Sequence, residues 1–104
     1  MTHDPLLQPF QLKHLTLKNR LMITSHEPAY PEDGLPTERY RAYHVERARG
    51  GVALTMTAGS AVVSRDSPPA FNNILAYRDE VVPHMKALTD ASYFAWKIRL
   101  SLWC

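Results

Sequence analysis

The stretch RARGGVALTMTA, residues 47–58, joins the basic end of a predicted helix directly to a predicted strand. Residues 52–58 are nearly continuous in apolar and β-branched side chains, which is typical of a strand buried on both faces. The segment LMIT, residues 21–24, has the same character. Because a helix lies between these strands, and only Gly50-Gly51 separates it from the second, the order predicts a right-handed βαβ unit with parallel strands.

The helix of this unit is predicted over residues 38–49. Thr37 is placed to cap its first turn, and Arg47 and Arg49 are cations in its last turn, where they favour the helix dipole. Apolar and small side chains recur three to five positions apart and predict one inward stripe. The members of that stripe are Tyr40, Tyr43, Val45 and Ala48. The helical histidines His44 and His84 are expected to be ordinary surface or helix-packing residues.

Three further segments complete the expected organisation. Residues 10–17 alternate apolar and polar side chains, like the two arms of a short hairpin. A second helix is predicted to open at Asp79-Glu80. The side chains expected on its inner face are Val82, Met85, Leu88 and Thr89. Residues 97–103 alternate strictly, which fits either an edge strand or an unpaired tail.

Two long irregular segments, residues 25–36 and 59–77, follow the two predicted strands. Ligands of parallel α/β folds bind at the carboxyl ends of the strands, so a site is expected here. Imidazole and carboxylate side chains are ordinary metal ligands, which opens a metal interpretation for His26, Glu27 and Asp33. Their spacing matches no metal-binding pattern, so no metal site is predicted.

The composition is that of an ordinary globular protein, with 45% hydrophobic and 21% charged residues in a chain of 104. Twelve Lys and Arg against ten Asp and Glu give a formal charge of +2, spread too evenly to predict a nucleic-acid partner. No apolar stretch approaches the roughly 20 residues of a membrane helix, and residues 1–5 do not resemble a signal peptide. We therefore expect a cytoplasmic protein without a membrane partner. The single cysteine, Cys104, cannot form an internal disulfide, which agrees with this compartment.

Four motifs, in this order and spacing, resemble the N-terminal part of the old yellow enzyme family. They are Pro9-Phe10, LKNRLM at 17–22, RARGGVAL at 47–54 and LTDA at 88–91. The likeness runs from about Leu6 to Ala91, and it is closest to the amine-dehydrogenase and dienoyl-CoA-reductase branch. The members of this family are FMN-dependent NADH:flavin oxidoreductases built on a TIM (β/α)8 barrel.

The resemblance implies an α/β fold, the N-terminal part of such a barrel, with a hairpin and two to three βα units. Residues 1–91 would form the first part of the FMN-binding barrel, and residues 92–104 a divergent tail. The implied cofactor is FMN, with NADH or NADPH as electron donor and an iron-sulfur cluster only in a longer parent protein. The implied partner is a small-molecule substrate.

In the family, the residues at the end of the first barrel strand lie under and beside the flavin ring. The corresponding flavin-binding positions are Thr24, Ser25, His26, Glu27 and, after the second strand, Ala58. His26 could instead be a plain loop histidine. The family usually has Thr or Cys where this chain has Glu27. A carboxylate beside the ring disfavours the anionic reduced flavin unless it is protonated or paired.

The resemblance implies an enzyme that reduces an activated alkene or oxidises an N-methylated amine. The family's substrate-binding residues, its proton-donor Tyr and its phosphate-binding groups belong to later strands, so the catalytic residues of this chain are unknown. The alternative hypothesis is a truncated product with no independent activity, because an open part of a barrel leaves strand edges unpaired and apolar faces uncovered.

Overall fold

The computed structural model describes residues 3–57, 59–96 and 99–101. Its elements within these ranges are η1 (Pro5–Leu7), β1 (Phe10–Leu12), β2 (Leu15–Leu17), β3 (Met22–Ile23), α1 (Glu38–Arg49), β4 (Leu54–Met56), α2 (Val81–Trp96) and β5 (Arg99–Ser101). The strands β1 and β2 pair antiparallel, which confirms the hairpin expected over residues 10–17. The other strands of the described chain form one sheet in the order β3-β4-β5.

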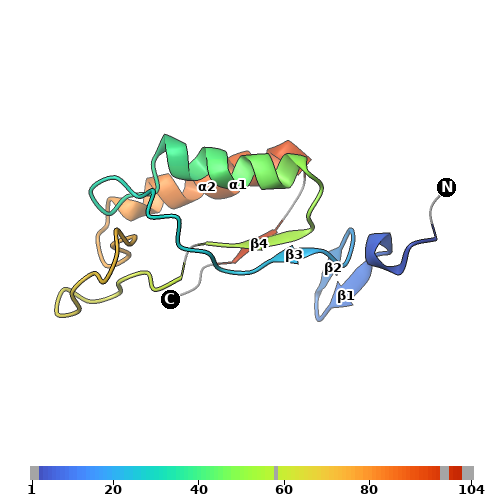
Figure 1. Cartoon of the computed structure of the whole chain (residues 1–104), viewed down its shortest axis with the longest axis horizontal. Coiled ribbons are helices and arrows are strands. Elements are labelled where there is room, and N and C mark those ends of the chain that lie inside the picture. Colours follow the sequence, from blue (N-terminus) through green and yellow to red (C-terminus); the bar gives the residue numbers. More distant parts are fainter. Residues whose placement is uncertain (1–2, 58, 97–98, 102–104) are drawn as a thin grey trace.

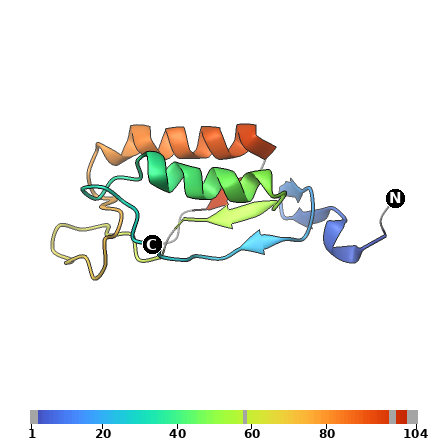
Figure 2. The same cartoon turned by 45° about the horizontal axis from the view of Figure 1, so that its top comes forward.

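The sheet confirms the parallel βαβ unit. Met22 pairs with Leu54 and Ile23 with Thr55, both in parallel register. The two strands are shorter than the predicted segments, and Met22 is 49% exposed, so the prediction that the first strand is covered on both faces is wrong. The reason is that α1 and α2 lie over one face of the sheet, so side chains on its other face are not covered by these helices (Figures 1 and 2).

The helices α1 and α2 lie side by side over one face of this sheet (Figures 1 and 2). The bounds of α1 match the predicted helix, but its inward stripe is different. The buried residues of α1 are Tyr40, His44 and Ala48, spaced one helical turn apart, while Tyr43 and Val45 are half-buried. The predicted cap is also wrong in detail, because the hydroxyl of Thr37 is buried without a hydrogen bond to the first turn.

The second helix begins at Val81, directly after Asp79-Glu80, and continues to Trp96. Of its predicted inner face, Leu88 is fully buried, but Val82 is 65% exposed, and the adjacent Val81 packs inward instead. After this helix, β5 pairs parallel with β4, so the structure shows the edge strand and not the unpaired tail. The domain boundary proposed at residue 91 stays a prediction.

The main apolar core joins both helices to the segment between β4 and α2. Its buried members are Tyr40, Ala61, Ile74, Val81 and Leu88. The backbone N–H of Val62 donates to the carbonyl of Ile74 at 2.8 Å, which folds this segment back on itself. The second long loop thereby packs against both helices through this core.

His44 lies where α1 packs on the sheet. It is 2% exposed, and its Nδ1 is 3.2 Å from the Oγ1 of Thr55 on β4. The ring of Tyr40 lies 5.2 Å away, centroid to centroid. Burial, and then the positive charge of Arg47, lower the pKa of His44 from 6.5 to about 4. The imidazole is therefore neutral in the folded protein at neutral pH, as a helix-packing histidine.

A lowered folded-state pKa makes stability depend on pH. The contribution of His44 is fully present above pH 6.5 and is lost as the pH falls toward 4, because the unfolded chain then binds the proton first. We expect the free energy of unfolding to fall by about 3 kcal/mol over this range from this group. Urea unfolding at several pH values measures it. His44→Asn should flatten the profile, while the exposed-site control His14→Asn should not; equal slopes in all three proteins would contradict the assignment.

Candidate functional site

Four of the predicted flavin-binding residues come together at one edge of the sheet. Residues 24–27 leave β3 at its carboxyl end, beside the carboxyl end of β4, because the two strands are parallel (Figure 1). Thr24 and His26 are exposed, and Ser25 and Glu27 are half-buried. The hydroxyl of Ser25 lies 3.9 Å from the Sδ of Met56 and so links the two strand ends. Ala58, the fifth predicted position, lies outside the described residues.

Glu27 connects the two long loops. One oxygen of its carboxylate accepts a hydrogen bond from the backbone N–H of Ala29 at 2.9 Å, and the other accepts from the side-chain amide of Asn73 at 3.2 Å. Asn73 is 2% exposed and belongs to the loop after β4. Both donors are neutral, so they hold the carboxylate in place without cancelling its charge.

Further contacts fasten the first loop to the second. The side-chain amide of Asn72 donates to the carbonyl of Ala29 at 3.1 Å and also to that of Pro31. The N–H of Leu75 donates to the carbonyl of Gly34 at 2.8 Å. Gly34 has a φ of +75°, and a Cβ there would lie 2.4 Å from the Cγ of Leu75. The two loops therefore form a single layer at the carboxyl end of the sheet.

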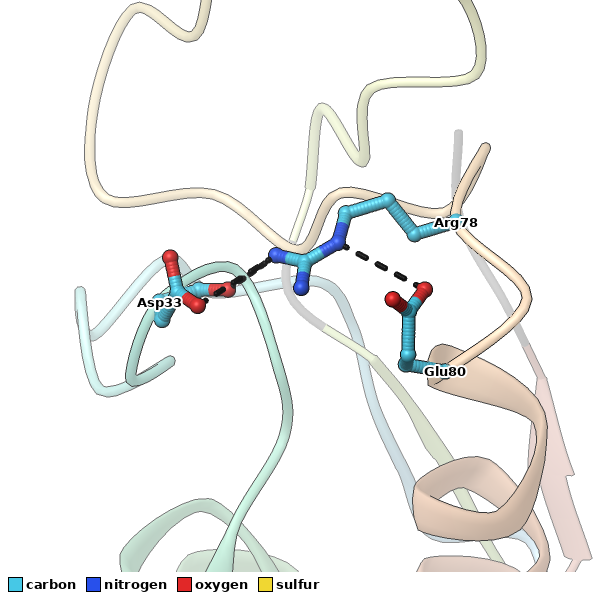
Figure 3. Close-up of polar contacts among 3 residues, drawn as sticks. All are labelled: Asp33, Arg78 and Glu80. Carbon is cyan, nitrogen blue, oxygen red and sulfur yellow. Dashed lines mark hydrogen bonds and ion pairs between the residues drawn. The ribbon is translucent and has the colours of Figure 1, made fainter.

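Arg78 closes the outer end of this layer (Figure 3). Its guanidinium donates to the backbone carbonyl of Asp33 at 2.6 Å and forms ion pairs with the carboxylates of Asp33 at 3.6 Å and Glu80 at 3.7 Å. The side chain of Arg78 is 22% exposed, whereas those of Asp33 and Glu80 are 87% and 63% exposed. Water therefore screens both ion pairs, and the hydrogen bond to the carbonyl is the stronger contact.

A group of rings lies against the first loop beside this edge. The Nδ1 of His26 is 2.9 Å from the hydroxyl of Tyr43, and the two rings stack with centroids 6.1 Å apart. The guanidinium of Arg47 lies 3.3 Å from the centroid of the Tyr43 ring, and that of Arg39 lies 3.8 Å from the Tyr30 centroid. The contact between Tyr43 and His26 could not be predicted from the sequence, because it depends on the path of the loop between them. Arg47 therefore packs on the ring of Tyr43 in addition to placing a positive charge in the last turn of α1.

The described residues contain neither a metal-binding group nor a membrane-spanning helix. Among the residues that the structure describes, no three His, Cys, Asp or Glu side chains gather as a metal-binding group. Within that same part of the chain, every helix falls short of the length and apolar character needed to cross a membrane.

The donors at the strand end fit a flavin ring. Hydroxyl and imidazole groups can bond the carbonyl oxygens and nitrogens of an isoalloxazine, and Thr24 and His26 are exposed at this edge. The fold is a parallel α/β unit with these donors at the carboxyl edge of its sheet. The family model for the NADH:flavin oxidoreductase / NADH oxidase family matches residues 5–93, and the chain belongs to this family.

Two relatives carry the likeness at high identity. A probable N-methylproline demethylase of Rhizobium meliloti (strain 1021) is 76% identical over 91 residues, which are 88% of this chain and 13% of the relative. A multifunctional alkene reductase/demethylase OYE of Caballeronia cordobensis is 55% identical over 87 residues, 84% of this chain and 13% of the relative. The chain thus spans about an eighth of the length of these relatives.

A solved structure confirms the fold. A morphinone reductase variant in complex with tetrahydroNAD superposes with a TM-score of 0.80 at 22% identity, covering 94% of this chain and 26% of that one. The expected fold class, the N-terminal part of a TIM barrel with a hairpin and βα units, is therefore correct. The described residues form an open sheet and not a closed barrel.

The close approach at Gly34 generates a stability prediction. Gly34→Ala places a Cβ on the Leu75 side chain at a positive φ, so we expect a loss of about 2 kcal/mol or more in the free energy of unfolding. Gly50→Ala is the matched control, because Gly50 has an ordinary φ of −69°, and its effect should stay within about 0.5 kcal/mol. Urea unfolding of the two variants measures the difference. Equal effects would mean that the two loops do not form one layer in solution.

Proposed function

We propose that residues 24–27, together with Ala58, form part of the FMN site of an oxidoreductase. The enzyme would take a hydride from NADH or NADPH and reduce an activated alkene, or would oxidise an N-methylated amine. The observation that carries the proposal is the gathering of Thr24, Ser25, His26 and Glu27 at the carboxyl edge of two parallel strands. The names of the two relatives, an alkene reductase/demethylase and an N-methylproline demethylase, support both substrate classes.

In this proposal, FMN supplies the hydride chemistry when it is bound. The chain's own residues bind and orient the ring. The hydroxyls of Thr24 and Ser25 and the imidazole of His26 offer hydrogen bonds, and contacts between the two loops support the segment that carries them. The carboxylate of Glu27 adds a fixed negative charge nearby, because its hydrogen-bond donors are neutral. An iron-sulfur cluster and a cytoplasmic location remain predictions.

A second proposal concerns the isolated chain: it holds no stoichiometric FMN and has no independent activity. It is supported by apolar side chains that remain exposed in the structure, among them Met22 at 49% on the outer edge of β3 and Phe94 at 81% on α2. Open strand edges and exposed apolar side chains favour association or misfolding. Yellow protein that keeps equimolar flavin through gel filtration and oxidises NADH would contradict this proposal.

A chimera tests the site. Residues 5–93 of this chain would replace the matching segment of the Caballeronia enzyme, to which the chain is 55% identical. We expect the chimera to purify with bound FMN and to be reduced by NADPH. Flavin absorbance after gel filtration and anaerobic reduction measure both properties. A folded chimera without flavin, beside a parent that keeps it, would contradict the proposed site.

The charge of Glu27 provides a finer test in the same chimera. Glu27→Gln removes a negative charge near the ring, so the flavin midpoint potential should rise by an amount on the order of tens of mV. Glu32→Gln is the matched control, since Glu32 is an exposed carboxylate on the same loop. Spectroelectrochemical titration compares the three proteins. Equal shifts in both variants would place Glu27 away from the ring.

A further inference from the structure

We propose that Tyr43 is the positioning residue for His26: its hydroxyl donates to Nδ1 of the imidazole, which leaves the proton on Nε2 and presents Nε2–H to the ligand at the strand edge. This inference rests on the proposed function, since it names how one residue of that site is oriented. Tyr43 comes from α1, whereas His26 and its neighbours at residues 24–27 come from the loop after β3.

Two independent contacts fix the imidazole. The hydroxyl oxygen of Tyr43 lies 2.9 Å from Nδ1, which sets the position of one ring nitrogen. The two rings stack at an interplanar angle of 28°, which sets the plane of the imidazole. A hydrogen bond and a stacking contact from the same side chain define both the direction and the tilt of an exposed histidine. The bond made by one ring nitrogen also decides the protonation of the other.

Tyr43 is itself held firmly enough to act as this support. The guanidinium of Arg47 lies 3.3 Å from its ring centroid and donates to its backbone carbonyl at 3.0 Å. The edge of Tyr30 approaches the same ring at 5.9 Å between centroids, and buried His44 approaches at 5.2 Å. The cation draws electron density toward the ring face, which favours the phenol as donor and Nδ1 as acceptor.

The orientation of His26 defines what it can recognise. An Nε2–H is a hydrogen-bond donor, so it suits an acceptor atom such as a ring carbonyl, an imine-type nitrogen or a carboxylate oxygen. An isoalloxazine edge carries the first two of these. Nε2 makes no hydrogen bond within the described part of the chain, so it is available for this contact.

Nitrogen NMR of the full 104-residue chain tests the inference without flavin. At about pH 8, where an ordinary imidazole is neutral, we expect His26 to carry its proton on Nε2 and the Nδ1 signal to show the upfield shift of a hydrogen-bond acceptor. Tyr43→Phe keeps the ring and removes only the hydroxyl, so that shift should be lost. Tyr30→Phe, which alters a neighbouring ring of the same cluster, should retain it.

Two results would overturn the inference. A proton found on Nδ1 in the unmodified chain would leave Nε2 as an acceptor, and an unchanged Nδ1 signal in Tyr43→Phe would remove Tyr43 from any positioning role. The FMN-loaded chimera separates this from the proposed function. If it holds flavin but its His26 Nε2 signal does not differ from that of the flavin-free chain, the presentation toward the ligand is wrong. A chimera without flavin counts against the proposed site alone.

Discussion

The parallel register between β3 and β4 is the constraint on which the site depends. Asn19 sets this register from the opposite end of the strands. Its side-chain amide donates to the carbonyl of Gly51 at 2.7 Å, and its side-chain oxygen accepts from the N–H of Leu21 at 3.0 Å. Because this one side chain, 8% exposed, fixes where both strands begin, it also fixes that they end at the same edge. The chemistry of residues 24–27 follows from that alignment.

The layer formed by the two loops is a consequence of the same edge. Long irregular segments carry backbone N–H and carbonyl groups that need partners when they are packed together. The amide of Asn72 and the guanidinium of Arg78 supply such partners from the second loop to carbonyls of the first, and the amide of Asn73 bonds the carboxylate of Glu27. Gly34 then allows the closest approach of the two backbones. The candidate site is therefore supported by polar contacts between the loops, in addition to the apolar core on which both loops pack.

The sequence predicted the parts of the fold that depend on local pattern. The helix over residues 38–49 and the parallel order around it follow from periodicity and from the short Gly50-Gly51 link. The exposure of Met22 could not be predicted in this way, because the burial of a strand side chain depends on what packs against its face of the sheet. The predicted inward stripe of α1 was wrong at two positions. His44 is buried and hydrogen-bonded to Thr55, and Tyr43 contacts His26 of the loop.

The position of residues 24–27 at the carboxyl end of a strand could be predicted, but the contacts that support them could not. Residues 24–27 are found by counting from the end of a strand, whereas Asn73 meets Glu27 across 46 positions and Tyr43 meets His26 across 17. Such contacts depend on the path of the loops, which the sequence pattern leaves open.

These contacts also determine where charged groups lie around the candidate site. Glu27, which is next to His26 in the sequence, carries a fixed negative charge, while the positive charge of Arg47 lies over the ring of Tyr43. The hydrogen bonds that Glu27 accepts come from neutral donors, so they hold its carboxylate in place without cancelling the charge that would oppose an anionic ring in the proposed site. In the proposed site, the negative charge of Glu27 near the flavin ring would have to be offset by a hydrogen-bond donor directed at that ring. An oriented Nε2–H of His26 would supply such a donor without adding a full positive charge. The carboxylate of Glu27 and the imidazole of His26, which Tyr43 supports, would therefore act together on the ring in the proposed site.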